Sequence, residues 1–168
     1  RFGDLQVLRY QVKGFDELSL QQKQLAYYLY EAAMCGRDII YDQKYKYNLT
    51  IRKTIDAIYS SYNGDKTSED WKKFEVYAKR IWFSNGIHHH YSNMKMMPDF
   101  TREYFFNLLK YTDANLLPLE GKPLEALANT LTPILFEEKV DAKIVDQSAG
   151  IDNIKASANN FYEGLTQK

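Results

Sequence analysis

The sequence predicts a mainly α-helical protein, a single helical domain of about five helices with one or two short strands. Apolar residues recur at the helical period along most of the chain, whereas strand-like alternation is confined to short segments. The length of 168 residues is that of one domain, so we expect residues 1–168 to form a single unit. A hydrophobic content of 45% with 26% charged residues is typical of a globular protein.

The first helix is expected to begin at the N-cap Ser19 and to continue to about Tyr41. Before it, residues 5–12 alternate apolar and polar side chains, which predicts a short strand or an extended arm. The apolar positions of the helix repeat every three or four residues, as in a helix that packs on a core. They are Leu25, Tyr28, Leu29, Ala32, Gly36, Ile39 and Ile40.

Turn and capping residues delimit the next two helices. Residues 48–62 form the second helix, which ends at Asn63-Gly64-Asp65. Ser68 is the expected N-cap of the third, and Gly86 has the position of a glycine that follows a helix C-terminus. The apolar faces of the two helices are Ile51, Ile55, Ile58 and Tyr62, and then Trp71, Phe74, Ala78, Ile81 and Trp82.

The second half of the chain is expected to add two more helices. Thr101 caps a short fourth helix, and Pro123 begins a fifth helix that Pro133 breaks or bends. Residues 143–146 predict a possible strand, and residues 152–163 a loop or a short helix. Thr166 has the character of an N-cap, which requires a following helix. This cap and the absence of an initiator Met lead us to expect a piece of a longer protein.

Charge and apolar patterning argue against several classes of partner. Lys and Arg number 22, as do Asp and Glu, so the formal net charge is zero. Nucleic acids and anionic membrane surfaces require a concentrated positive field, so we expect neither as the main partner. No apolar run approaches the roughly 18 residues of a membrane span. The single cysteine, Cys35, excludes an internal disulfide and leaves the compartment open.

The three histidines of the chain occupy consecutive positions, 88 to 90, directly after Asn85-Gly86. A catalytic zinc needs about three protein ligands at one point. Consecutive helical side chains diverge by about 100°, whereas on a strand His88 and His90 share a face and supply two ligands. The chain has no His-Glu-x-x-His motif. We expect no independent metal site, and two interpretations remain: histidines that order a loop by hydrogen bonding, or histidines that line a substrate cleft.

Several segments carry a family resemblance: residues 14–23, 27–33, 36–39, 77–91 and 159–166, with Lys95 and Pro98 at matching spacing. They resemble the N-terminal part of the dipeptidyl peptidase III family, zinc metallopeptidases that release dipeptides from peptide N-termini. The closest similarity is to the members found in Bacteroides-type bacteria. It covers essentially the whole chain, and its most specific parts are residues 84–91 and the final Tyr-x-Gly-x-Thr pattern. Met96 departs from the family, which has an aromatic residue there.

The resemblance implies a two-lobed enzyme in which this chain belongs to the lobe opposite the zinc and residues 84–91 face the cleft. Asn85, His89, His90 and Tyr91 are then the expected substrate-binding residues, through hydrogen bonds to the backbone of a short peptide. The zinc motifs of the family, His-Glu-x-x-Gly-His and Glu-Glu-x-Arg-Ala-(Glu/Asp), are both absent from this sequence. The resemblance therefore implies no catalytic residue and no cofactor here, with zinc in the full-length protein.

Two functions follow from these observations. In the first, the chain is the N-terminal helical portion of a zinc exopeptidase that is inactive alone, and its partners are a short peptide and the missing C-terminal lobe. Such an enzyme is either cytoplasmic or exported to the periplasm of a bacterium. In the second, the chain is a free-standing helical interaction module, and its histidine-rich loop binds a partner or an ion.

Overall fold

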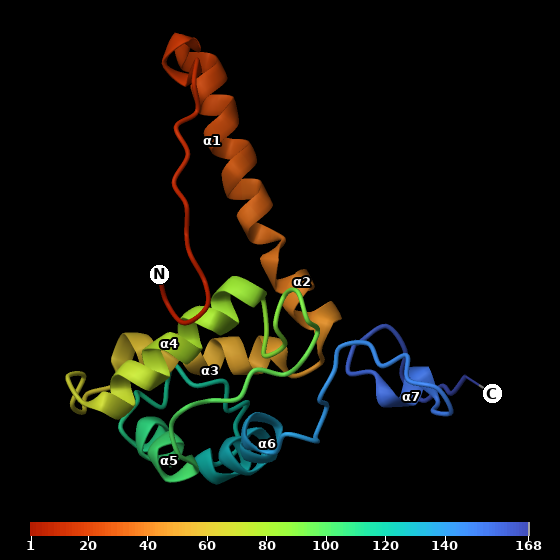
Figure 1. Ribbon diagram of the computed structural model, residues 1–168. Coiled ribbons are helices and arrows are strands. Elements are labelled where there is room, and N and C mark those ends of the chain that lie inside the picture. The colour runs from red at the N-terminus through yellow and green to blue at the C-terminus, as the bar shows by residue number, and fades with distance from the viewer. Residues whose placement is uncertain (168) are drawn as a thin grey trace.

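The computed structural model describes residues 1–167, which form seven α-helices and one 3-10 helix. Helices α2 to α6 gather in one body, from which the N-terminal arm and α1 project, while α7 lies to one side (Figure 1). The mainly α fold predicted from the sequence is confirmed. The elements are η1 (Phe15–Glu17), α1 (Leu20–Cys35), α2 (Arg37–Lys44), α3 (Asn48–Ser61), α4 (Glu69–Ser84), α5 (Arg102–Lys110), α6 (Leu124–Phe136) and α7 (Asn153–Ala156).

A single hydrophobic core joins the helices of the body. Helix α3 packs against α2 and α4, and α5 packs against α6. Phe100 connects these two groups, because its ring centroid lies 5.8 Å from that of Phe74 in α4 and 5.8 Å from that of Phe136 in α6. The apolar faces of α3 to α6 supply the most deeply buried aliphatic side chains, which include Ile51, Ile58, Ile81, Leu108 and Leu131.

Three of the N-caps expected from the sequence are confirmed. The side-chain oxygens of Ser19, Ser68 and Thr101 each accept a hydrogen bond from a backbone N–H in the first turn of the following helix. Helix α6 begins directly after Pro123 but is not broken by Pro133, which lies inside it. Proline has no N–H to donate to the carbonyl four residues earlier, so one helical hydrogen bond is missing at Pro133 while α6 continues to Phe136.

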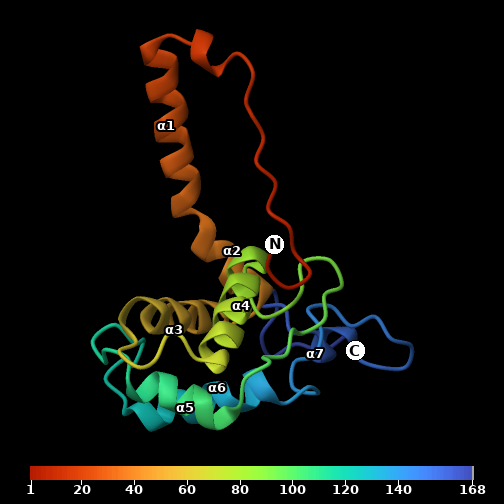
Figure 2. The same cartoon turned by 60° about the vertical axis from the view of Figure 1, so that its left-hand side comes forward.

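The single helix expected from Ser19 to about Tyr41 is two helices. Helix α1 ends at Cys35, α2 begins at Arg37, and Gly36 lies between them. No side chain of α1 is buried, whereas Tyr41 of α2 is fully buried. Two views of the molecule show why, since α1 points away from the body along its whole length (Figures 1 and 2). The apolar stripe of α1 therefore meets no core in the described part of the chain.

The expected strands do not form as such within residues 1–167. Residues 5–12 and 143–146 contribute only single bridges, Phe2 with Leu5 and Met94 with Lys143, and a third bridge joins His88 to Lys95. Residues 6–12 are extended and pair with no other strand, and their one backbone hydrogen bond in the described chain is that which the carbonyl of Val12 accepts from the N–H of Phe15 at 3.3 Å. The helix expected after Thr166 falls on Lys168 and beyond, outside the described residues. In the described range, no helix combines the length and apolar character needed to cross a membrane.

Candidate functional site

The histidine loop, residues 85–96, starts at a turn held by a buried asparagine. Asn85 has the left-handed conformation, with φ 52° and ψ 50°, and Gly86 has φ 140°. Asn48 of α3 is fully buried, and its Oδ1 accepts a hydrogen bond from the N–H of Ile87 at 3.1 Å. A Cβ atom on Gly86 would lie 2.1 Å from the Asn48 amide nitrogen. The turn therefore requires glycine for its backbone angle and for space, and it sets the direction in which the loop leaves α4.

The loop then doubles back as a narrow, hydrogen-bonded hairpin. The N–H of Met96 donates to the carbonyl of Ile87 at 2.8 Å, and the N–H of His89 donates to that of Met94 at 2.8 Å. On its outer side, the N–H of Lys95 donates at 2.8 Å to a carbonyl in the segment after α6. The loop is thus held on both sides by backbone pairs.

Lys95 anchors the returning limb of the loop to the C-terminal end of α6. Its Nζ donates to the backbone carbonyl of Ile134 at 3.1 Å and to the carbonyls of Glu137 and Val140. Partial burial lowers the pKa of Lys95. A cation at this position satisfies carbonyls that the helix leaves without a partner. Lys95 is therefore a structural element of the site.

His88 points into the protein. Its side chain is only 1% exposed, and its Nε2 lies 2.7 Å from the carbonyl oxygen of Asp141, so Nε2 carries the proton and donates. Its Nδ1 is buried without a hydrogen-bond partner in residues 1–167. Burial lowers the pKa of His88, and the charge of Lys95 acts in the same direction. His88 is consequently a neutral, packed histidine that joins the loop to the segment after α6.

His89 has partners at both ring nitrogens, hydrogen bonds at Nδ1 and a carboxylate near Nε2. Its Nδ1 accepts from the backbone N–H groups of Tyr91 and Ser92, both at 3.2 Å, and its Nε2 lies 3.4 Å from a carboxylate oxygen of Asp4. The hydrogen bond from Arg80 to Asp4, 2.8 Å long, lowers the pKa of that carboxyl and keeps it charged. His89 therefore orders the tip of the loop and ties it to the N-terminal residues.

His90 and Tyr91 are the exposed members of the predicted set. The His90 ring packs against Phe83 of α4, with centroids 4.9 Å apart, and Tyr91 is 87% exposed. Asn85 is half-buried at the start of the loop. The structure thus brings His89, His90 and Tyr91 together at one tip and gives only His90 and Tyr91 a free outer face. The assignment of all four residues to substrate binding stays a prediction.

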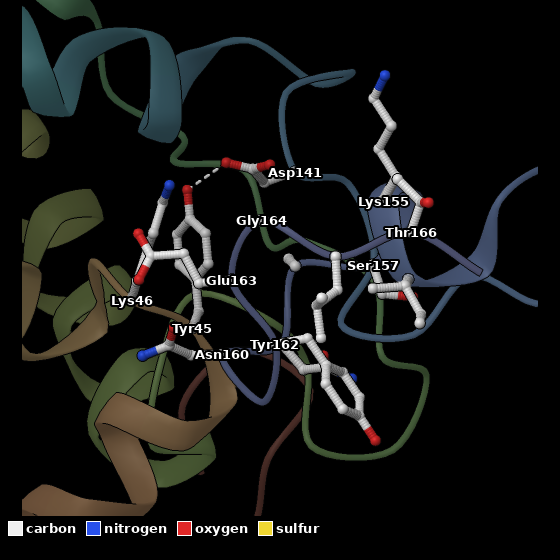
Figure 3. A pocket seen from close by; sticks show the side chains of 14 residues that line it. Tyr45, Lys46, Asp141, Lys155, Ser157, Asn160, Tyr162, Glu163, Gly164 and Thr166 are labelled. Carbon is white, nitrogen blue, oxygen red and sulfur yellow. Dashed lines mark hydrogen bonds between the residues drawn. The ribbon is translucent and has the colours of Figure 1, made fainter. Parts of the chain in front are cut away.

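Asp141 connects the histidine loop to a hollow of about 660 Å³. The hydroxyl of Tyr45 donates to its carboxylate, and burial together with this hydrogen bond raises the pKa of Tyr45 (Figure 3). The Tyr45 ring in turn packs edge-on against His88, with centroids 5.5 Å apart. The hollow is lined by the residues of the Tyr-x-Gly-x-Thr pattern, Tyr162, Gly164 and Thr166, and by the charged residues Lys46, Lys155 and Glu163. Because both signs of charge are present, the lining favours neither cations nor anions.

The donor groups of this chain do not fit a zinc ion. His88 is buried and faces a backbone carbonyl, so it is turned away from the rings of His89 and His90, whose centroids lie 4.4 Å apart. Of that pair, His89 is engaged by Asp4 and His90 packs on Phe83. Over residues 1–167, no three His, Cys, Asp or Glu side chains lie close enough together to hold a metal. The strand arrangement that gives His88 and His90 a shared face does not occur, because one is buried and the other exposed. No chemical step through a metal follows from these residues.

The sequence interpretation missed the residues that support the loop: Asn48, Asp141, Arg80 and Asp4. Their contacts span 39, 53 and 76 positions of the chain. Arg80 lies in the segment 77–91 and Asn48 at the start of the second expected helix, but no spacing or pattern links these four residues, so the sequence contains no signal for their convergence. Comparisons with known proteins add no further guide. No model of a known protein family matches the chain, and no curated protein matches it significantly.

Proposed function

We propose that this chain is the N-terminal helical portion of a zinc-dependent dipeptidyl peptidase of the dipeptidyl peptidase III type, and that its histidine loop forms part of the substrate cleft. Sequence support comes from the resemblance of residues 84–91 and 162–166 to that family. The observation that carries the proposal is geometric: the loop is anchored on both sides yet presents His90 and Tyr91 to solvent. A surface held in place before binding loses little entropy when it takes up an extended peptide.

In this role the residues of the chain bind and orient the peptide. The ring nitrogens of His90 and the hydroxyl of Tyr91 can donate to peptide carbonyls or accept from peptide N–H groups. His88, Asn48 and Lys95 hold the loop that carries them. Zinc activates water in enzymes of this type. Here it would be held by residues outside this sequence, because no donor set among residues 1–167 fits.

The gene sequence downstream of Lys168 gives the most direct test. We expect a His-Glu-x-x-Gly-His motif, and a stop codon soon after Lys168 would overturn the proposal. In the longer enzyme, replacing His90 with Ala and Tyr91 with Phe should raise KM for a short peptide. The expected loss in kcat/KM is about 10-fold, from one or two hydrogen bonds of about 0.5–1.5 kcal/mol each. The change Tyr111→Phe, at an exposed tyrosine outside the histidine loop, is the control and should leave KM unaltered.

The second candidate is a helical interaction module, and the exposed apolar side chains of α1 favour it. In that case the histidine loop binds an ion or a partner by itself. One equivalent of tightly bound zinc in the purified chain, lost on replacing His88 and His90, would favour the module over the peptidase portion. Equilibrium dialysis followed by metal analysis measures this, with His89→Ala as a further comparison.

A further inference from the structure

The accessible surface of the chain is too large for a self-contained protein of its mass. It measures 11393 Å², whereas a compact monomer of 19.7 kDa exposes about 8,600 Å². The excess of about 2,800 Å² is well above the roughly 800 Å² that each partner contributes to a stable interface. The arm–α1 hairpin, residues 6–35, projects from the body (Figure 2), and 12 of the 26 large hydrophobic side chains that are exposed in the described chain lie in it.

Both ends of the arm–α1 hairpin are fixed to the body. At one end Leu5 is buried, the ring of Phe2 contacts that of Phe83 at 6.2 Å, and Asp4 pairs with Arg80. At the other end, α1 runs into α2, which packs on α3. The hairpin is therefore held in position for a partner, and it is not a loose tail.

Helix α1 has the composition of a helix that is covered on more than one side. From Leu25 to Cys35 its only charged residue is Glu31. Tyr28 and Leu29 on the stripe are exposed, and so are Tyr27 and Tyr30 beside it. A helix that is apolar around most of its circumference is a buried helix. The partner must therefore present an apolar surface to α1.

The arm has the pattern of a β-strand without a neighbour. Leu8, Tyr10 and Val12 alternate with Arg9 and Gln11, which places apolar side chains on one face and polar side chains on the other. Tyr10 is 83% exposed. No backbone N–H of residues 6–13 donates a hydrogen bond within the described part of the chain. An extended segment with free backbone groups and a clear register is the form in which a peptide adds a strand to an open sheet.

Charge and backbone chemistry argue against nucleic acid and a lipid surface as the occupant. The hairpin carries Arg9, Lys13 and Lys23 against Asp16, Glu17 and Glu31, so it has no field to attract nucleic acid or an anionic surface. A lipid surface would cover α1 but would leave the free N–H and C=O groups of the arm without partners, which is costly in hydrocarbon. A β-sheet in a protein partner would both cover the apolar side chains of α1 and supply hydrogen-bond partners to the backbone of the arm.

We propose that the arm–α1 hairpin docks this helical portion onto a β-sheet in the rest of the two-lobed enzyme, with residues 8–12 as an added edge strand and α1 on the apolar face of that sheet. This inference rests on the proposed function, because the sheet belongs to the longer protein. It assigns the exposed hairpin a partner of defined chemistry: a sheet with a free strand edge and one uncovered apolar face.

Hydrogen exchange of the longer gene product, compared with the 168-residue chain, tests the docking. In the chain alone the amides of residues 7–12 should exchange at nearly the rate of an unfolded peptide. In the longer protein, those facing the sheet should exchange at least about 100-fold more slowly. Equally fast exchange in both would overturn the docking. A dimeric 168-residue chain with a protected arm would overturn it in favour of a second copy, and light scattering after size exclusion detects that dimer.

A matched pair of variants tests the strand register in the longer protein. Tyr10→Ser should lower the Tm by about 2 °C or more, because its side chain packs on the sheet, whereas Gln11→Ser on the opposite face should not. Equal effects of the two changes would contradict the edge-strand arrangement. The zinc motif and the peptidase activity of the same protein report separately on the proposed function. An active enzyme whose arm amides exchange as fast as in the 168-residue chain would therefore overturn only the docking. A longer protein without the zinc motif would overturn the proposed function.

Discussion

Helices α1 and α4 are alike in sequence terms and opposite in their surroundings. Each has 16 residues and begins at a serine N-cap, Ser19 or Ser68, whose hydroxyl oxygen accepts a backbone hydrogen bond from the first turn. Helix α4 buries six side chains, among them Phe74 and Ile81, whereas α1 buries none. The comparison shows that capping and helix-forming residues are enough to define a helix. The burial of its apolar face depends on which other elements lie beside it.

The largest expected difference between the two helices is in the free energy of unfolding. Ile81→Ala in α4 removes a fully buried side chain and should cost about 2–5 kcal/mol. Leu29→Ala in α1, where the side chain is 62% exposed, should change stability by less than about 0.5 kcal/mol. Urea unfolding followed by circular dichroism measures both. Similar losses for the two variants would show that α1 is covered in the 168-residue chain.

A second contrast between the body and α1 is the pH dependence of stability, which in the body comes from His88. Its folded-state pKa lies below the 6.5 of the unfolded chain, because burial disfavours the charged form. The folded protein then binds fewer protons than the unfolded chain, so the stabilisation is complete above pH 6.5 and is lost as the pH falls below it. The slope is at most about 1.4 kcal/mol per pH unit.

Urea unfolding between pH 7.5 and pH 5 measures this slope. The variant His88→Phe should lose this part of the pH dependence, whereas replacement of the exposed His90 by Gln should keep it. Persistence of the full slope in His88→Phe would assign the titration to other groups. None of the contacts of His88 described above involves α1. The helix content of α1 should therefore not change with pH together with the stability of the body.

The smallest expected effects concern the two N-caps. Ser68→Ala should lower the global stability by about 1 kcal/mol, because α4 is part of the cooperative core. Ser19→Ala removes one half of a capping box with Gln22. It should reduce the helix content of α1 without moving the global transition. Far-ultraviolet circular dichroism and backbone chemical shifts distinguish the two outcomes, and a global loss from Ser19→Ala would mean that α1 unfolds together with the body.

Local sequence patterns predicted the helices of the body well. They predicted the arm and the end of α1 less well. The N-caps at Ser68 and Thr101 and the glycine after α4 depend on hydrogen bonds and backbone angles within a few residues, which the sequence displays directly. The break at Gly36 was not expected, because the apolar stripe continues through it at the correct period. The strand pattern of residues 5–12 is clear, but a strand needs a neighbour, and none is present in the described part of the chain.

For the candidate site, the sequence by itself determined which residues gather in one loop: Asn85, the three histidines and Tyr91. It also determined where that loop begins, since Gly86 is required after the end of α4. Only the tertiary structure decided that His88 faces inward, that His89 is engaged by Asp4, and that His90 and Tyr91 remain exposed. The physical reason is the range of the interactions: caps and turns act over three or four residues, whereas the contacts that hold the loop join segments from 39 residues apart, Asn48 with Ile87, to 85 residues apart, Asp4 with His89.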